Sequence, residues 1–249
     1  MLFPDYEIER MKIEAVLFDM FDTLMMIERD HAFYSPSLKR VYEYLKERGV
    51  KVSFKEFEEA YVEARDALYA TADPKMEEPH FNQRIANALR NLGYTFPVSS
   101  EIVVGATNAF CETFMDFVRV DDSAIESLRR LHGKYKLGIV SNFAIPECVY
   151  KLLQRHTLTE LFDVVIVSGE VNKRKPSPEI FKKALVALGI KAQSAVFVGD
   201  TIDADIEGAK NAGMKTIYIE RRVQQAAKDA CPDQTIKTMS DLLPALERC

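Results

Sequence analysis

Five short runs of apolar residues recur along the chain, and polar or turn-forming residues follow most of them. The runs are four to six residues long and rich in valine and isoleucine. Apolar residues mostly stand next to one another in them, which is typical of strands that are covered on both faces. We therefore expect buried β-strands at Ile13–Phe18, Leu137–Val140, Val164–Val167, Ala195–Val198 and Thr216–Ile219.

Between the later runs, apolar residues recur at the three- and four-residue spacing of α-helices. This pattern predicts helices at Pro146–His156, Pro178–Leu188 and Ala204–Ala212. Strands that alternate with helices in this way indicate right-handed crossovers, which join parallel strands. The fold class that we expect is therefore α/β, with a parallel sheet between helices.

The interval between the first and second runs breaks this alternation. It is longer than a hundred residues, too long for one crossover helix, and its pattern is helical. We predict an inserted helical domain over residues 26–118 and a core formed by residues 1–25 and 119–249, with hinges at residues 25–30 and 117–122. The helices expected in the insert are Ser37–Arg48, Ser53–Ala70, His80–Leu92 and Ser99–Phe117.

Residues with reactive or metal-binding side chains follow four of the five predicted strands. They are Asp19, Asp22 and Thr23 after the first strand, Ser141 and Asn142 after the second, Lys175 after the third, and Asp200, Asp203 and Asp205 after the fourth. Ligands of parallel sheets bind beyond the carboxyl ends of the strands, so these side chains should meet at one edge. Crowded carboxylates need a cation, and Mg²⁺ prefers oxygen ligands of this kind. A carboxylate beside a metal ion and a lysine can attack an electrophilic phosphorus.

This ordered set of residues resembles the motifs of the haloacid dehalogenase (HAD) superfamily of hydrolases. The resemblance spans about residues 12–25 and 119–249, and the helical insert matches the C1-type cap that many members carry after the first motif. It implies a Rossmann-like core with an inserted α-helical cap domain.

The resemblance also implies a role for each motif residue. Asp19 would be the nucleophile, Thr23 holds the threonine position of the first motif, and Lys175 would neutralise charge on the reacting groups. Ser141 would hold a phosphoryl oxygen, with Asn142 beside it. The Mg²⁺ ligands would be Asp19, the backbone carbonyl of Phe21, Asp200 and, through water, Asp205, which the Gly-Asp-x4-Asp spacing favours over Asp203.

The first motif departs from that of the superfamily's phosphatases at one position. These enzymes usually carry a second aspartate two residues after the nucleophile, where it acts as general acid and base, and here Phe21 stands there. Loss of such a group typically costs about 10²- to 10⁴-fold in rate. Asp22 is a possible substitute acid, but neighbours in an extended segment point to opposite sides, so it could act only if the turn is rearranged.

Three functions remain open on these residues. We favour a Mg²⁺-dependent phosphatase that acts on a small phosphate ester through an aspartyl-phosphate. A 2-haloacid dehalogenase is the alternative, because such enzymes have an aromatic residue at the position of Phe21, although Gly199-Asp200 is similar to the metal-binding motif of phosphatases. A non-catalytic binding protein on the same core is the second alternative.

The amino-acid composition limits the classes of binding partner that we expect. The 249 residues include 33 basic and 38 acidic ones, and the net charge of −5 argues against nucleic acid as a partner. The sequence also lacks a long apolar membrane segment, and its four cysteines are far apart, so we expect a cytoplasmic protein, monomer or homodimer, with a small anionic substrate. Candidates for substrate selection on the insert are His31, Tyr34, His80, Asn82 and Arg84.

Overall fold

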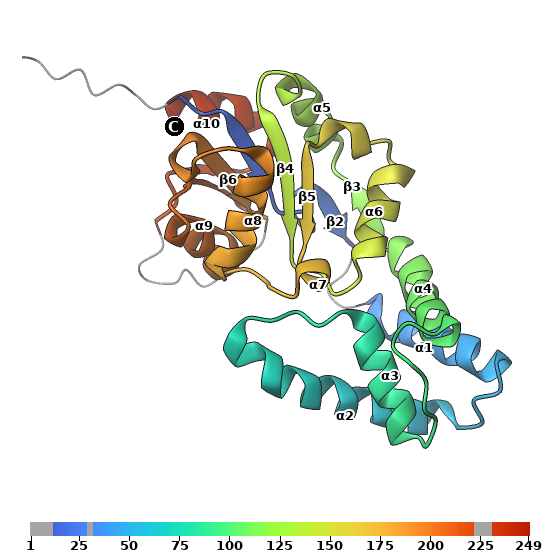
Figure 1. The fold of residues 1–249 in the computed structure, drawn as a ribbon. Helices are drawn as coiled ribbons and strands as arrows, with labels where there is room; N and C mark the ends of the chain where they lie inside the picture. The colour runs from blue at the N-terminus through green and yellow to red at the C-terminus, as the bar shows by residue number, and fades with distance from the viewer. Residues whose placement is uncertain (1–11, 29–31, 222–230) are drawn as a thin grey trace, which may run out of the picture.

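The computed structural model describes residues 12–28, 32–221 and 231–249, and its main sheet is parallel and six-stranded (Figure 1). The strand order is β5-β4-β1-β6-β7-β8. The strands are β1 (Ala15–Phe18), β4 (Lys136–Ser141), β5 (Val164–Val167), β6 (Ala195–Gly199), β7 (Lys215–Ile219) and β8 (Gln234–Ile236). The predicted parallel α/β sheet is confirmed. The apolar pattern does not predict β8, because two of its three residues, Gln234 and Thr235, are polar.

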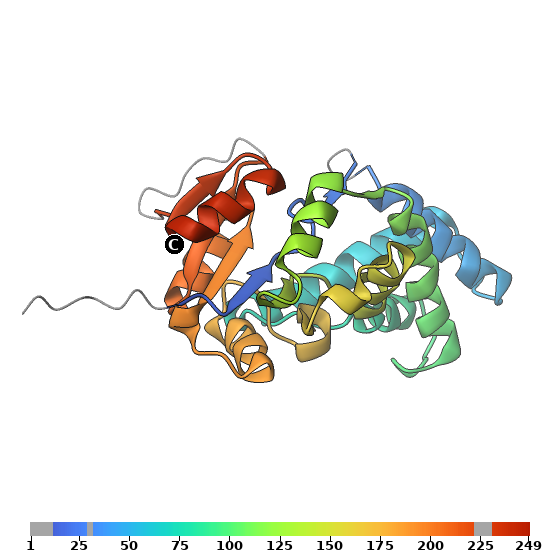
Figure 2. The same ribbon diagram turned by 90° about the horizontal axis from the view of Figure 1, so that it is seen from above.

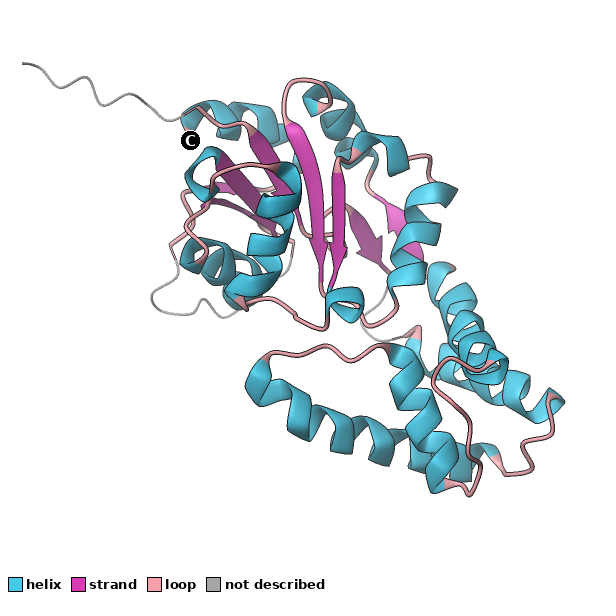
Figure 3. Ribbon diagram, viewed as in Figure 1, coloured by secondary structure: helices cyan, strands magenta, loops and turns pink. Residues whose placement is uncertain are grey.

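Helices cover both faces of this sheet, as Figures 2 and 3 show. Along β1, Val16 and Phe18 belong to one apolar cluster, whereas Ala15 and Leu17 belong to another. Successive side chains of a strand point to opposite faces, so a strand covered on both sides must be apolar throughout. The covering helices are α5 (Asp122–Leu131), α6 (Pro146–Arg155) and α10 (Leu242–Arg248) in the first cluster, and α8 (Pro178–Leu188) and α9 (Gly208–Asn211) in the second.

The long segment between β1 and β4 is mainly helical, as predicted, and a short antiparallel ribbon joins its ends. The ribbon pairs β2 (Met25–Ile27) with β3 (Val118–Val120), so the two expected hinge segments lie side by side. Figure 1 shows the intervening helices beyond the arrowheads of β4 and β5, next to the carboxyl edge of the sheet. They are α1 (Tyr34–Glu47), α2 (Phe54–Ala72), α3 (Phe81–Asn91) and α4 (Glu101–Met115).

The start of α2 shows how local sequence defines a helix end. The Ser53 hydroxyl accepts a hydrogen bond from the Glu56 backbone N–H, and the Glu56 carboxylate accepts one from the Ser53 backbone N–H. This reciprocal capping satisfies two backbone donors that the first helical turn leaves without partners. Helix α2 then packs against α3, and α1 packs against α4.

The segment after β6 differs from the single regular helix that we predicted at Ala204–Ala212. A π-helical turn spans Ile202–Glu207, and α9 follows it. Such wide turns are frequent at functional sites. The remaining short helical segments are α7 (Ser168–Val171) and the 3₁₀ turns Asp73–Lys75, Thr159–Leu161, Ala192–Ser194 and Met239–Asp241. In the described parts of the chain, no helix has the length and apolarity needed to cross a membrane.

Candidate active site

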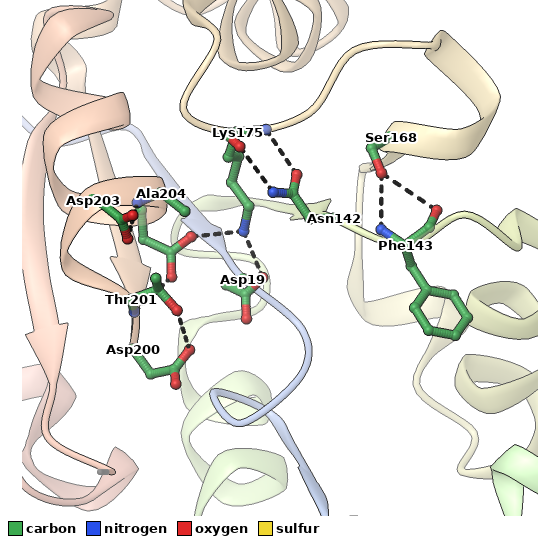
Figure 4. A network of polar contacts seen from close by, with 10 residues as sticks. Asp19, Asn142, Phe143, Ser168, Lys175, Asp200, Thr201, Asp203 and Ala204 are labelled. Carbon is green, nitrogen blue, oxygen red and sulfur yellow. Dashed lines mark hydrogen bonds and ion pairs between the residues drawn. The ribbon is translucent and has the colours of Figure 1, made fainter. Parts of the chain in front are cut away.

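Three adjacent strands bring the predicted site residues to one edge of the sheet. β1 lies between β4 and β6, and all three run parallel. Asp19 follows β1 directly, Ser141 is the last residue of β4, and Asp200 follows β6. Lys175 comes from the segment between α7 and α8 and points toward Asp19 (Figure 4).

The Lys175 ammonium lies between two buried carboxylates. Its Nζ is 2.5 Å from Asp19 Oδ1 and 2.7 Å from Asp205 Oδ1. All three residues are buried, and Lys175 is only 3% exposed. Breaking one member of such a buried ion pair leaves an uncompensated charge, so the three groups depend on one another.

Asn142 holds the segment that carries Lys175. Its side-chain Oδ1 accepts a hydrogen bond from the Lys175 backbone N–H at 2.7 Å, and its Nδ2 donates to the Lys175 carbonyl at 3.0 Å (Figure 4). Both ends of the Asn142 amide therefore bind one backbone unit. This geometry makes Asn142 a positioning residue for Lys175.

Of the two aspartates that follow Asp200, Asp205 rather than Asp203 lies with Asp19, Asp200 and Lys175 in the buried charged cluster. The Asp205 carboxylate accepts a hydrogen bond from the Thr201 backbone N–H at 3.0 Å and is almost fully buried. Asp203 is exposed, and its carboxylate accepts from the Ala204 backbone N–H.

Burial and mutual repulsion dominate the electrostatics of this cluster. Asp19, Asp200 and Asp205 each offer an oxygen within 4.8 Å of the others. Burial raises the pKa of Asp19 to about 6, although Lys175 opposes the rise. Burial, followed by the charges of Asp19 and Asp205, raises the pKa of Asp200 to about 8. Burial alone would lower the pKa of Lys175, but the carboxylates of Asp19 and Asp205 outweigh it and raise that pKa.

A cavity of about 230 Å³ opens onto these groups. It is lined by Asp19, Phe21, Asp22, Asn142, Lys175, Asp200, Thr201, Ala204 and Asp205. Thr201 and Ala204 were not predicted as site residues. The Thr201 hydroxyl, which donates to Asp200 Oδ1 at 3.4 Å, was an available signal directly after Asp200, whereas the apolar Ala204 reaches the cavity through the π-helical turn. Thr23 and Ser141 are fully buried beside the cavity's residues, and their hydroxyls have no hydrogen-bond partner among the described residues.

The turn after β1 is not extended, which changes the position expected for Asp22. Asp22 has a φ of +61°, in the left-handed region, and both Phe21 and Asp22 line the cavity. Asp22 Oδ1 accepts a hydrogen bond from the Ile27 backbone N–H at 3.1 Å. The Phe21 ring contacts Phe114 of α4 and Phe143, with centroids 5.5 and 4.9 Å away. The turn therefore places Asp22 in the wall of the same cavity as Asp19.

Of the residues on the insert that were candidates for substrate selection, some line a cavity and others make contacts within the protein. Tyr34 and Arg84 line a second cavity next to the first. His80 caps the start of α3 and pairs with Glu147 at 3.2 Å, and the Asn82 carbonyl accepts a hydrogen bond from Thr107. His31 lies outside the described residues.

Comparison with known proteins shows the family to which this chain belongs. A family model described as haloacid dehalogenase-like hydrolase matches residues 13–213. A Methanopyrus kandleri protein named glyceraldehyde 3-phosphate phosphatase is 31% identical over 239 residues, which cover 93% of this chain and 96% of the relative. A Halalkalibacterium halodurans protein named pyrophosphatase PpaX is 36% identical over 125 residues, which cover 49% of this chain and 57% of the relative.

Solved structures of a dehalogenase and of a phosphatase share the fold of this chain. A 2-haloacid dehalogenase from Pseudomonas syringae pv. Tomato DC3000 has a TM-score of 0.73 and 25% identity, with 95% of this chain and 99% of that chain covered. A HAD phosphatase from Thermococcus onnurineus has a TM-score of 0.64 and 26% identity, with 94% of this chain and 98% of that chain covered.

Proposed function

The chain belongs to the haloacid dehalogenase-like hydrolase family, and from that premise we propose that it is a Mg²⁺-dependent phosphatase of small phosphate monoesters. The observation that carries the proposal is the Lys175 ammonium between the buried carboxylates of Asp19 and Asp205, with Asp200 beside them. Nucleophilic carboxylates and metal ligands are the groups that phosphoryl transfer requires. Curated relatives that are named phosphatases support this choice.

The acidic cluster fits a magnesium ion. Asp19, Asp200 and Asp205 each offer a carboxylate oxygen within 4.8 Å of the others, and oxygen ligands of this kind suit Mg²⁺. We propose that Asp19, Asp200 and the backbone carbonyl of Phe21 hold Mg²⁺, and that Asp205 acts through a water molecule. When bound, the ion would supply positive charge to the phosphoryl oxygens.

Asp19 is the proposed nucleophile. One of its carboxylate oxygens forms a bond to phosphorus while the bond from phosphorus to the leaving oxygen breaks, which produces an aspartyl-phosphate. Water then attacks the phosphorus, inorganic phosphate leaves, and the carboxylate is restored. Lys175 favours the ionised form of Asp19 that this attack requires. The buried Ser141 hydroxyl is the proposed donor to a phosphoryl oxygen, and the buried Thr23 hydroxyl is a further proposed site group.

Asp22 is the proposed proton donor for leaving groups that need one. It lines the same cavity as Asp19, whereas Phe21 cannot transfer a proton. The departing oxygen would take its proton from the Asp22 carboxyl. Phe21 instead supplies an apolar wall beside the reacting groups.

Helices α1–α4 are the proposed cap over this site. We propose residues 26–118 as the cap domain and residues 1–25 and 119–249 as the core. A cap that closes on the core excludes water until the substrate is bound. A hydrogen bond from the Phe81 backbone N–H to the Ala144 carbonyl, 2.9 Å long, joins the two parts.

Phosphate release from an activated aryl phosphate tests the proposed function directly. We expect release that requires Mg²⁺ and falls by at least about 10³-fold in Asp19→Asn, because the nucleophile is lost. Asp203→Asn is the matched control and should keep activity, because Asp203 is exposed and outside the cluster. Equal release by the wild type and Asp19→Asn would remove the proposal.

A second candidate function follows from Phe21. Its ring, packed against Phe114 and Phe143, gives the cavity the apolar wall that suits a halide leaving group, which needs no proton. Halide release from a 2-haloacid in the presence of a chelator, absent in Asp19→Asn, would favour a dehalogenase over a phosphatase.

A further inference from the structure

A second cavity, of about 260 Å³, lies between helices α1–α4 and the loop after β4. It shares Asn142 with the catalytic cavity, and the Phe143 ring in its wall contacts Phe21 in the wall of the other. The two spaces therefore adjoin. Its volume is near the lower end of the roughly 300–1,000 Å³ of typical small-molecule sites. A small group could occupy it while a phosphate lies at Asp19.

The walls of this second cavity are mostly aromatic, with two charged groups among them. The charged residues are Glu78, in the segment that leads to α3, and Arg84, within α3. The aromatic residues are Phe33, Tyr34, Phe81, Phe110 and Phe143. Such a lining suits a molecule with carbon–hydrogen faces and a few polar groups.

Arg84 is held in place by neutral groups. Its Nη1 donates to the Tyr61 hydroxyl at 3.1 Å, and its Nη2 donates to the Tyr69 hydroxyl at 2.8 Å. The guanidinium forms no ion pair among the described residues, and its Nε has no hydrogen-bond partner there. An arginine has five N–H donors, so Arg84 keeps donor capacity beyond its two tyrosine contacts.

A single side-chain hydroxyl, that of Tyr69, links Glu78 to Arg84. The Tyr69 hydroxyl that accepts from Arg84 donates in turn to the buried Glu78 carboxylate. One wall of the cavity thus offers a hydrogen-bond donor and an acceptor at neighbouring positions. A hydroxyl group can serve both, because it accepts and donates at once.

We propose that this cavity binds the leaving group of the phosphate ester and that Arg84 and Glu78 make it specific for a small hydroxylated group, a polyol or sugar. The inference rests on the proposed phosphatase function and assigns its substrate class. The aromatic walls pack against the carbon–hydrogen faces of the polyol, while Arg84 donates to a hydroxyl oxygen and Glu78 accepts from a hydroxyl. Arg84 and Glu78 are specificity-determining residues and do not touch the reacting phosphorus.

Three phosphate esters with the same six-carbon chain test this assignment: sorbitol 6-phosphate, hexyl phosphate and 6-phosphogluconate. The readout is kcat/KM for Mg²⁺-dependent phosphate release by the full chain. The variants are Arg84→Met and Glu78→Gln, and the matched control is Arg90→Met, an exposed arginine on the same helix. Because each variant is compared with the wild type on one ester at a time, differences in leaving-group reactivity cancel.

We expect Arg84→Met and Glu78→Gln each to lower kcat/KM for sorbitol 6-phosphate by about 10- to 100-fold. On hexyl phosphate, each variant should stay within about 3-fold of the wild type, because a plain alkyl chain uses neither residue. Arg90→Met should match the wild type on all three esters. If Arg84→Met does not fold, the nearly isosteric Glu78→Gln decides the question.

Two outcomes would overturn the assignment while leaving the phosphatase intact. One is an equal loss on hexyl phosphate and sorbitol 6-phosphate, or no loss on either. The other is a wild-type preference for 6-phosphogluconate that disappears in Arg84→Met, which would make the cavity an anion site. If no ester shows release above the Asp19→Asn blank, the proposed function fails and this inference fails with it.

Discussion

At the scale of single residues, Asp22 is the proposed proton donor of the site. Its left-handed backbone brings its side chain to the same cavity as Phe21, where an extended segment would have separated them. Aspartate and asparagine tolerate this conformation better than other residues with a side chain. The carboxylate also accepts the Ile27 backbone N–H, so it has a structural contact as well as a proposed chemical one.

The Asp22→Asn variant separates these two contributions. Asparagine keeps an acceptor for Ile27 and tolerates the same φ, but it cannot give up a proton. We expect its kcat to fall by about 10²- to 10⁴-fold on an alkyl phosphate but only a few-fold on an aryl phosphate, whose leaving group needs little protonation. Equal rates of the variant and the wild type on both esters would exclude Asp22 as the acid.

The raised pKa of Asp200 predicts that the stability of the protein, and the proposed binding of Mg²⁺, depend on pH. The pKa of about 8 lies above the ordinary 3.8, so between about pH 4 and 8 the unfolded chain loses this proton while the folded chain keeps it. Without metal, the free energy of unfolding should therefore decrease as the pH rises through this window, by up to about 1.4 kcal/mol per pH unit from this group. Below pH 4 and above pH 8 this contribution should be constant.

Thermal unfolding with and without Mg²⁺ measures this linkage. We expect Mg²⁺ to raise Tm more at pH 8 than at pH 5.5, because the ion binds the ionised carboxylates and competes with protons. Asp200→Asn should remove most of both effects, and Asp203→Asn should retain them, since only the former changes the cluster. A Mg²⁺ effect on Tm that is the same at both pH values would contradict the expected coupling.

At the scale of elements, the end of β6 and the π-helical turn after it together position the Asp205 carboxylate. Gly199 is the last residue of β6, and the turn brings the Asp205 side chain back against it. A Cβ atom on Gly199 would lie 2.4 Å from Asp205 Oδ2 and 2.5 Å from Asp205 Cγ. Those distances are too short for non-bonded atoms, so the absence of a side chain at Gly199 permits the Asp205–Lys175 contact.

Gly199→Ala should therefore act through Asp205. We expect the displaced carboxylate to weaken its ion pair with Lys175, to lower Tm, and to reduce phosphate release by at least about 10-fold. Ala204→Gly is a useful comparison, because it changes a neighbouring small residue of the same turn without adding an atom. Full activity of Gly199→Ala at wild-type Tm would show that the turn adapts and that the contact is not required.

At the scale of the whole molecule, the segment that carries Lys175 also contacts the proposed cap. The Arg174 guanidinium is 2.7 Å from Asp73 Oδ1, and the Lys173 ammonium donates to the Lys75 carbonyl at 3.0 Å. The Arg174 backbone N–H also donates to the Met76 carbonyl at 2.9 Å. The position of helices α1–α4 and the position of Lys175 are thus linked through neighbouring residues.

The Arg174→Met variant tests whether this ion pair supports the contact between the proposed cap and the core. The Arg174 and Asp73 side chains are 25% and 55% exposed, so the pair should contribute no more than about 1 kcal/mol. We expect kcat/KM to decrease by about 2- to 5-fold at low salt, with a smaller difference at 0.5 M salt because exposed charges are screened. Arg65→Met is the control, since Arg65 pairs with Asp66 inside α2. The same salt response in both variants would argue against a role in closure.

The sequence by itself determined the sheet and the residues at its edge. Strands that are covered on both faces must be apolar runs, and parallel connections bring the ends of β1, β4 and β6 together. The edge positions of Asp19, Ser141 and Asp200 therefore followed from the strand pattern, whereas Lys175, between α7 and α8, was singled out by its motif context. Local patterns also located the helices between β1 and β4, because an amphipathic helix shows its period within a few turns.

Only the tertiary structure decided the features that depend on distant partners. β8 has no apolar run and forms because β7 offers an open edge, and β2 pairs with β3 across more than ninety residues. The left-handed conformation of Asp22 follows from the folded turn, and Arg84 meets Glu78 through Tyr69 of another helix. Periodicity reports which face of an element is buried, but it carries no information about what that face touches.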